Sequence, residues 1–273
     1  MANITPAQHL EEVLDRYRDS PNPRLAEITT AAIRHLHAFV EEVSLTREEW
    51  FTGIKTLTAI GQLCDEKRQE FILLSDTLGV SMLVEMINQA GAEGTTEPTV
   101  FGPFHVDDAP RCAMGESIVI DPSDADRPLV LTGRILDLDG QPIGGAELDV
   151  WQTASDGTYD VQSDDQTPMN MRGVFTTGLD GRYEIHSVRP VAYPIPGDGP
   201  AGALLFANGR HNWRPGHVHF VVSAPGYKSV ITHLFDAESE YLDSDAVFGV
   251  RESLIIDMSD GTCDFDFVLE PET

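Results

Sequence analysis

Two tyrosines and two histidines in the second half of the chain have side chains that could bind one metal ion together. His217 and His219 lie in residues 214–222, a segment that alternates and ends in β-branched residues, as a strand does. Residues two apart on a strand point to the same face, so both imidazoles can reach one point in space. Tyr159 follows an Asp-Gly turn signal, and Tyr193 precedes a Pro-Ile-Pro run. Phenolate is a hard anionic ligand and imidazole suits iron, so this combination suggests non-haem ferric iron.

Each of these residues also has a simpler interpretation. A lone His-x-His on a strand is more often structural or exposed than metal-binding, and a lone tyrosine before a proline-rich loop usually packs against its neighbours. His35 and His37 have the same spacing but fall in a helical run, where residues two apart do not share a face. The chain contains neither a P-loop lysine motif nor a Gly-x-Ser-x-Gly motif. Spacing alone therefore leaves both a metal site and a structural role open.

The composition argues against several classes of function. Acidic residues outnumber basic ones by 45 to 18, which gives a formal net charge of −27. Such a chain repels DNA phosphates and anionic membrane surfaces, so we expect neither nucleic acid nor membrane as a partner. No apolar run is long enough to span a membrane, and the first residues lack the pattern of a signal peptide. The three scattered cysteines are typical of reduced thiols, so we expect a cytoplasmic protein.

The chain changes character near residue 97. Before it, apolar residues recur at helical spacing. After it, short strand-like segments such as residues 129–135 and 146–151 are separated by Asp-Gly turn signals. This density of strands and turns is typical of an antiparallel sandwich. We therefore predict an α+β protein with a helical region over residues 1–97 and an antiparallel β-sandwich over residues 98–273.

Taken together, the motifs of this chain resemble those of the intradiol ring-cleavage dioxygenases. The similarity rests on Trp-Gln to Gly-Thr-Tyr, Gly-Arg-Tyr, Arg-Pro to Tyr-Pro-Ile-Pro, and Arg-Pro-Gly-His-Val-His, at residues 151–159, 181–183, 189–196 and 214–219. Val-Phe-Gly-Pro-Phe at residues 100–104 resembles the start of the family's catalytic domain. The helical region resembles the family's dimerisation region. The resemblance implies a homodimer with one non-haem Fe(III) per subunit, and it allows for a phospholipid bound in the helical region.

The resemblance also implies a role for each candidate site residue. Tyr159, Tyr193, His217 and His219 would bind the iron, and Tyr193 would leave it to take up a substrate proton as a general base. Arg214 would stabilise negative charge that develops on the substrate ring. The substrates would be O₂ and an aromatic diol or triol, cleaved between its two hydroxyl-bearing carbons. Together with Arg214, the positions that match the family's substrate pocket are Leu73, Asp76, Val100, Phe101, Gly102, Pro103, Phe104, Ile195, Pro196, Gly197 and Val247.

Within the family, residues 99–106 and 242–250 resemble the branch that cleaves hydroxyquinol (1,2,4-trihydroxybenzene) to 3-hydroxy-cis,cis-muconate, which tautomerises to maleylacetate. Asp76 could accept a hydrogen bond from the third hydroxyl. His233 stands where the catechol branch usually has glutamine, and Gly197 is smaller than the residue expected there. A catechol or chlorocatechol 1,2-dioxygenase is the alternative. Two weaker alternatives are a metal-free β-sandwich binding module and an interaction protein built on the N-terminal helices.

Overall fold

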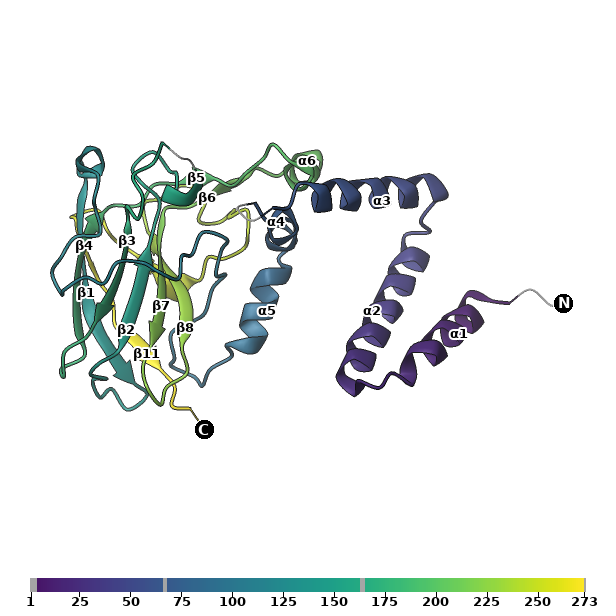
Figure 1. The fold of residues 1–273 in the computed structure, drawn as a ribbon, viewed down its shortest axis with the longest axis horizontal. Helices are drawn as coiled ribbons and strands as arrows, with labels where there is room; N and C mark the ends of the chain where they lie inside the picture. The colour runs from purple at the N-terminus through teal and green to yellow at the C-terminus, as the bar shows by residue number, and fades with distance from the viewer. Residues whose placement is uncertain (1–3, 66–67, 163–164, 273) are drawn as a thin grey trace. The chain divides into compact units, whose positions relative to one another are not determined.

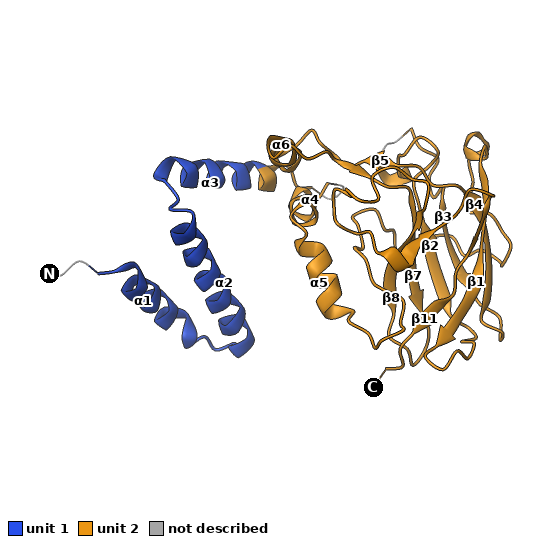
Figure 2. Cartoon of the chain, turned by 180° about the vertical axis from the view of Figure 1, so that it is seen from behind, with its two compact units in different colours: residues 1–59 blue, residues 60–273 orange. Residues whose placement is uncertain are grey.

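The structure is a computed structural model that describes residues 4–65, 68–162 and 165–272. The chain forms two compact units, Met1–Ala59 and Ile60–Thr273 (Figure 2). The first unit ends well before residue 97, because helices α4 (Glu70–Thr77) and α5 (Val80–Asn88) belong to the second unit. Residue 97 lies between the last of these helices and the first strand, so the change from helices to strands is confirmed. A functional division at that residue stays a prediction.

The first unit consists of helices α1 (Pro6–Arg18), α2 (Pro23–Glu42) and most of α3 (Arg47–Gln62). A capping box begins α1, in which the Thr5 side chain accepts from the Gln8 N–H and the Gln8 side chain accepts from the Thr5 N–H. The Asn22 side chain caps α2 by accepting from the N–H of Leu25. These helices leave large apolar side chains exposed in the single chain, among them Leu36, Phe39, Val40, Trp50, Phe51 and Ile54.

Two sheets form the centre of the second unit (Figure 1). In the smaller sheet, β1 is paired with β4, β10 and β11, at Pro128–Asp137, Arg182–Val188, Thr262–Asp264 and Phe267–Leu269. The larger sheet has the order β3-β2-β7-β8-β9, at Arg172–Thr176, Glu147–Trp151, His217–Ser223, Val230–Asp236 and Ile255–Ile256. Apolar side chains from both sheets form one core, so the predicted sandwich is confirmed.

The sequence had suggested an antiparallel sandwich, but some of its strand pairs are parallel. The long ladders β1–β4, β2–β3, β2–β7 and β7–β8 are antiparallel. Strands β10 and β11 pair with β1 in parallel, and β9 pairs with β8 in parallel. Parallel partners require a long connection. Between β1 and β10 it is the intervening body of the domain, and between β8 and β9 it is residues 237–254. Turn signals identify hairpins between neighbouring strands, but they carry no information about such distant pairs.

Side-chain alternation decides which face of the larger sheet carries the candidate site. In β7, Val218, Phe220 and Val222 are fully buried in the sandwich core. His217 and His219 alternate with them and therefore point to the opposite, outer face. A second cluster of buried apolar residues covers that face, formed by Met82, Val100, Trp151, Tyr159, Tyr193, Ile195, Ala246 and Val247. The candidate ligands are thus buried outside the sandwich and not within it.

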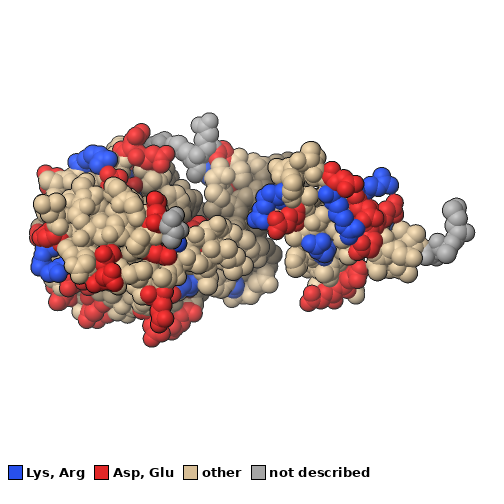
Figure 3. All heavy atoms as spheres, turned by 90° about the horizontal axis from the view of Figure 1, so that it is seen from below, with Lys and Arg blue, Asp and Glu red and all other residues tan. Residues whose placement is uncertain are grey.

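Short elements and loops complete the second unit. Strands β5 (Tyr193–Pro194) and β6 (Trp213–Arg214) pair with each other, and helix α6 (Pro200–Ala207) lies between them in the sequence. Among the residues that the structure describes, no helix has the length and apolar character needed to cross a bilayer. Acidic side chains are more abundant than basic ones on the face of the strand-rich unit drawn in Figure 3, in keeping with the charge imbalance of the sequence.

Candidate metal centre

Three separate elements bring the four predicted ligands together. Tyr159 comes from the loop after β2, Tyr193 from β5, and both histidines from β7. The β2–β7 register places Trp151 opposite His219, and the two rings stack with centroids 4.6 Å apart. All four candidate ligands are buried, none with more than 3% of its surface exposed. These side chains therefore expose almost no surface to bulk solvent.

The donor atoms of these four side chains converge. Tyr159 Oη lies 2.8 Å from His219 Nε2 and 3.1 Å from Tyr193 Oη. His219 Nε2 lies 3.2 Å from His217 Nε2. Donor atoms that each lie about 2 Å from one first-row metal ion are roughly 3 Å apart. The residues present therefore fit a single metal ion bound by two oxygen and two nitrogen atoms.

The protonation states of the ligands also suit a cation. His217 Nδ1 lies 2.7 Å from the Pro215 carbonyl, to which it donates, so its Nε2 keeps a lone pair. Burial lowers the pKa of His217 to about 3 and that of His219 well below its usual range, so both imidazoles are neutral. Burial raises the pKa of Tyr159 well above its usual value, so without a cation this phenol keeps its proton. A bound metal ion would replace the phenol protons.

Both the backbone and the ring of Tyr159 have close partners. The Tyr159 N–H donates to the Gln162 side chain at 2.7 Å, and its ring stacks on Phe104 with centroids 4.6 Å apart.

Gly157 has a φ of 83°, and a Cβ at this position would lie only 3.0 Å from Tyr193 Cβ. The turn before Tyr159 therefore needs glycine both for its backbone conformation and for the close approach of the second tyrosine.

Arg214 is fixed beside the ligands by a residue that the sequence did not reveal. Its Nε donates to Asp245 Oδ1 at 3.0 Å, and its Nη1 lies 3.2 Å from His217 Nε2. Burial alone would raise the pKa of Asp245, but the adjacent guanidinium outweighs it and holds the pKa below the usual range. The two partners are 31 residues apart in the chain, so spacing gives no signal of the pair.

A cavity of about 600 Å³ opens beside the ligands. Tyr193, His219 and Arg214 line it. So do most of the predicted pocket residues, namely Leu73, Asp76, Val100, Gly102, Pro103, Phe104, Ile195, Pro196 and Val247. The sequence missed a group of polar lining residues, Asp65, Arg68, Gln69, Glu70, His105, Asp160 and Gln162, together with Val161. Of these, His105 is held by Asp149, with His105 Nε2 and Asp149 Oδ2 2.7 Å apart.

Two residues predicted for the pocket wall do not line the cavity. The Phe101 ring packs behind it against His105 and Trp151, with centroids 4.8 and 5.9 Å apart. A Cβ on Gly197 would lie 2.9 Å from Phe206 Cζ and 3.0 Å from Asn212 Nδ2. Helix α6 and the chain after it thus occupy the space that a side chain at 197 would need. The small residue there reflects this packing and does not enlarge the pocket.

Asp76 lies on α4 with 6% of its surface exposed, and it lines the cavity. Burial raises the pKa of this carboxyl above its usual value, although Ser81 and Arg214 act in the opposite direction. The structure therefore places a buried acidic group at the wall of the cavity, where a polar group of a ligand could reach it.

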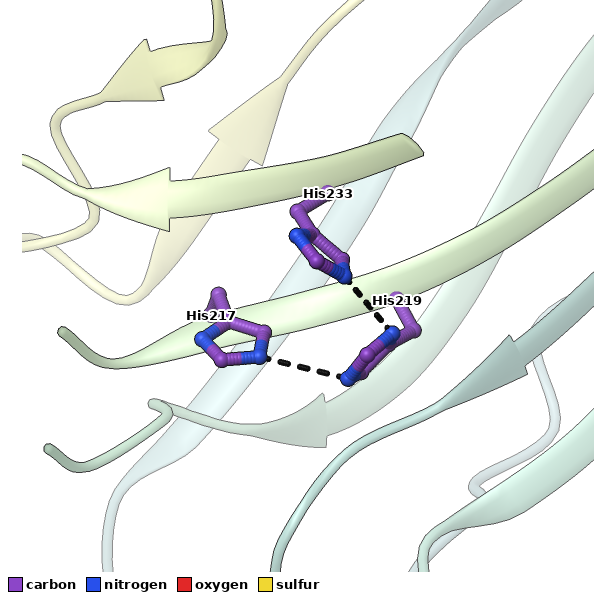
Figure 4. A group of neighbouring side chains, drawn as sticks. All are labelled: His217, His219 and His233. Atoms are coloured by element: carbon purple, nitrogen blue, oxygen red, sulfur yellow. Dashed lines mark hydrogen bonds between the residues drawn. The ribbon is translucent and has the colours of Figure 1, made fainter. Parts of the chain in front are cut away.

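His233, on β8, is the third histidine near the ligands (Figure 4). Its Nε2 lies 2.8 Å from His219 Nδ1, the nitrogen that points away from the other donor atoms. One nitrogen from each of His217, His219 and His233 lies within 4.8 Å of the others, a spacing that could hold a metal ion. The sequence had singled out His233 only as a departure from the catechol branch.

Comparison with known proteins finds matches over most of the chain. A family model described as Dioxygenase matches residues 100–271, and one described as Catechol dioxygenase N terminus matches residues 22–96. A 6-chlorohydroxyquinol 1,2-dioxygenase from Cupriavidus pinatubonensis is 52% identical over 264 residues, which are 95% of each chain. A hydroxyquinol 1,2-dioxygenase from a Rhizobium species is 52% identical over 248 residues, which are 90% of this chain and 83% of the relative.

Solved structures show the same likeness. A hydroxyquinol 1,2-dioxygenase from Pseudomonas putida superimposes with a TM-score of 0.91 at 46% identity, over 98% of this chain and 99% of that one. A catechol 1,2-dioxygenase from an Acinetobacter species reaches a TM-score of 0.84 at 27% identity, over 100% of this chain and 95% of that one. These matches span both the helical region and the sandwich. The chain therefore belongs to the intradiol ring-cleavage dioxygenases, a family of non-haem iron enzymes.

Proposed function

We propose that this enzyme binds one Fe(III) per subunit through Tyr159, Tyr193, His217 and His219, and uses O₂ to cleave hydroxyquinol. The convergence of two phenol oxygens and two imidazole nitrogens beside a cavity is the observation that carries the proposal. Relatives named for the cleavage of hydroxyquinol, or of its 6-chloro derivative, support the choice of substrate. The product is 3-hydroxy-cis,cis-muconate, which tautomerises to maleylacetate.

Ferric iron, when bound, supplies a Lewis acid that lowers the pKa of a substrate hydroxyl and orients the ring. Tyr193 would be the ligand that gives way to the substrate and takes up its proton. It lines the cavity from a two-residue strand, whereas Tyr159 is fully buried behind it and is held by Gln162 and Phe104. The more accessible phenol can leave with less disturbance of its surroundings, and a free phenolate is a suitable general base.

Arg214 lines the cavity as a fixed cation, held in place by Asp245. A positive charge that is already oriented stabilises negative charge on the substrate ring without reorganisation during the reaction. Asp76 provides selectivity for the triol. Its carboxyl accepts a hydrogen bond from the third hydroxyl, a contact that catechol cannot make.

A chlorinated hydroxyquinol is a second candidate substrate. The observation that favours it is the 52% identity to an enzyme named for 6-chlorohydroxyquinol. The cavity wall offers apolar groups from Leu73, Val100, Ile195 and Val247, against which a ring chlorine could pack.

We further propose that the helical region forms a homodimer and can hold a phospholipid, as the resemblance implies. Large apolar side chains of α2 and α3 support this, because Leu36, Phe39 and Trp50 are each at least half exposed in the single chain. Sedimentation is expected to show a dimer at micromolar concentration, and solvent extraction with mass spectrometry would identify any lipid. A monomer by sedimentation would refute the dimer.

The substrate proposal is tested by comparing kcat/KM for hydroxyquinol, 6-chlorohydroxyquinol and catechol on iron-loaded enzyme. Reaction under ¹⁸O₂, with mass analysis of the product, checks that oxygen from O₂ enters a ring-opened dicarboxylic acid. Preference for either triol over catechol supports the branch assignment. Equal efficiency with catechol would favour the catechol alternative, and absence of ring-opened product would refute the function as a whole.

A further inference from the structure

The contact between His219 and His233 lies on the side of His219 that faces away from the other donor atoms. His219 and His233 are directly opposite each other in the β7–β8 ladder. Their rings are perpendicular, at an interplanar angle of 88° with centroids 4.1 Å apart, and His219 Nδ1 lies 2.8 Å from His233 Nε2 (Figure 4). His233 is fully buried. This geometry directs Nε2 of His233 at Nδ1 of His219.

We propose that His233 is a positioning residue that stays outside the metal's coordination shell and fixes the tautomer and ring orientation of His219. The inference rests on the proposed metal site. His219 Nε2 faces Tyr159 Oη and His217 Nε2, whereas His233 approaches the opposite nitrogen. The third histidine of the cluster is therefore a hydrogen-bond partner of a ligand and not a ligand itself.

The hydrogen bond between the two rings has two arrangements, and only one allows His219 to bind a metal ion. A neutral imidazole carries a proton on one nitrogen only. If His233 donates from Nε2, His219 accepts at Nδ1 and its own proton must lie on Nε2, where the metal would bind. If His219 donates from Nδ1, its Nε2 keeps a lone pair for the metal. Metal binding therefore requires His233 to act as the acceptor, with its own proton on Nδ1.

The tautomer of His217, the other proposed histidine ligand, is fixed in a different way. Its Nδ1 donates to the Pro215 carbonyl, which can only accept, so the backbone alone fixes the tautomer. His219 has an imidazole as its partner, which can donate or accept. The ligand geometry at His219 thus depends on a side chain and can be altered by mutation.

The other nitrogen of His233, Nδ1, shows that the histidine lowers the stability of the fold. Among the described residues, His233 Nδ1 is buried without a hydrogen-bond partner. A buried polar atom left unpaired destabilises the protein, and an apolar side chain at this position would avoid that loss. The presence of histidine is best explained by what its Nε2 does for His219.

The test compares His233→Gln, whose side-chain carbonyl can still accept from His219, with His233→Leu, which cannot. Leu234→Val is the matched control, because Leu234 is equally buried on the same strand but faces the sandwich core. Fe(III) affinity is measured by chelator competition, together with the visible phenolate-to-iron band, kcat and KM. Loss of an outer partner of a metal-binding histidine typically weakens metal binding by about 10–100-fold.

We expect His233→Leu to lose affinity in that range and to shift the visible band, while His233→Gln retains most of the affinity and Leu234→Val matches the wild type. An unchanged affinity and band in His233→Leu would overturn the inference. Equal and complete loss of iron in both His233 variants would also overturn it, because that result identifies His233 as a ligand. If the wild-type protein bound no iron, the proposed function would fail first.

A measurement on the wild type avoids any dependence on the folding of the variants. In ¹⁵N-labelled protein loaded with Ga(III), a diamagnetic substitute for Fe(III), the histidine tautomers can be assigned by NMR. The expected result is a proton on Nδ1 of both His219 and His233. A proton on Nε2 of His233 would contradict the proposed arrangement.

Discussion

Arg214 and Asp245 form a buried ion pair with two contacts, in which Arg214 Nε lies 3.0 Å from Asp245 Oδ1 and Nη2 lies 3.3 Å from Oδ2. This leaves Nη1 directed at His217, a proposed ligand. The same carboxylate accepts from the backbone N–H groups of Val247 and Gly249. The Asp245 side chain therefore holds Arg214 beside the candidate metal centre and also holds the backbone of Val247, which lines the cavity.

Replacing Asp245 with asparagine is expected to destabilise the protein strongly. Asparagine has nearly the same shape but leaves the buried Arg214 charge unpaired, and breaking a buried pair costs about 3–5 kcal/mol. The free energy of unfolding, measured with denaturant, should fall by that amount, and kcat should fall as Arg214 loses its orientation. Asp243→Asn is the control, since Asp243 is exposed nearby on the same loop. Equal effects of the two substitutions would show that the pair has no special role.

The two tyrosines should respond differently to replacement by phenylalanine. Tyr159→Phe removes the ligand that we propose stays on the metal, so we expect loss of iron and of activity together. Tyr193→Phe should retain more of the iron and lose mainly turnover, with kcat lower by about 10²–10⁴-fold, the usual contribution of a general base. Iron content and kcat of the two variants, measured in parallel, check this. Identical iron loss in both would argue against distinct roles.

Asp76→Ala should narrow the preference for hydroxyquinol over catechol. The wild-type preference is expected to correspond to about 1–3 kcal/mol in kcat/KM, because a buried acceptor left unpaired costs about that much. The variant should lose activity mainly toward hydroxyquinol and change little toward catechol. Steady-state kinetics with hydroxyquinol and with catechol decide the point. A proportional loss for both substrates would assign Asp76 a structural role instead.

Iron affinity should fall steeply as the pH is lowered. Burial raises the pKa of Tyr159 in the metal-free protein, so this phenol is protonated until iron binds. The pKa of His217 is lowered to about 3, so this imidazole is already neutral and releases no proton near neutral pH. A metal ion displaces the proton of each phenol that binds it, so two phenolate ligands would release two protons and the apparent affinity would fall about 100-fold per unit of pH. Chelator competition between about pH 6 and 8 measures the slope, and a tenfold change per unit would indicate only one tyrosinate.

The parts of this site that could be predicted from sequence are those that local periodicity controls. His217 and His219 share a face because they are two apart on a strand, and the change of pattern near residue 97 lies between the last N-terminal helix and the first strand. Asp245 and His233 reach their partners only through tertiary contacts, so their spacing in the sequence does not predict these pairs. The crowding of Gly197 depends in the same way on α6, which a sequence pattern cannot place.

The visible spectrum of the iron-loaded protein, recorded with its iron content and its turnover of hydroxyquinol, tests the central claim most directly. Two tyrosinates on ferric iron give a strong charge-transfer band, so the protein should be red with one iron per chain. Addition of hydroxyquinol without oxygen should change the band as Tyr193 is displaced. A colourless protein that held a full complement of iron and still cleaved hydroxyquinol would contradict the assignment of Tyr159 and Tyr193 as ligands.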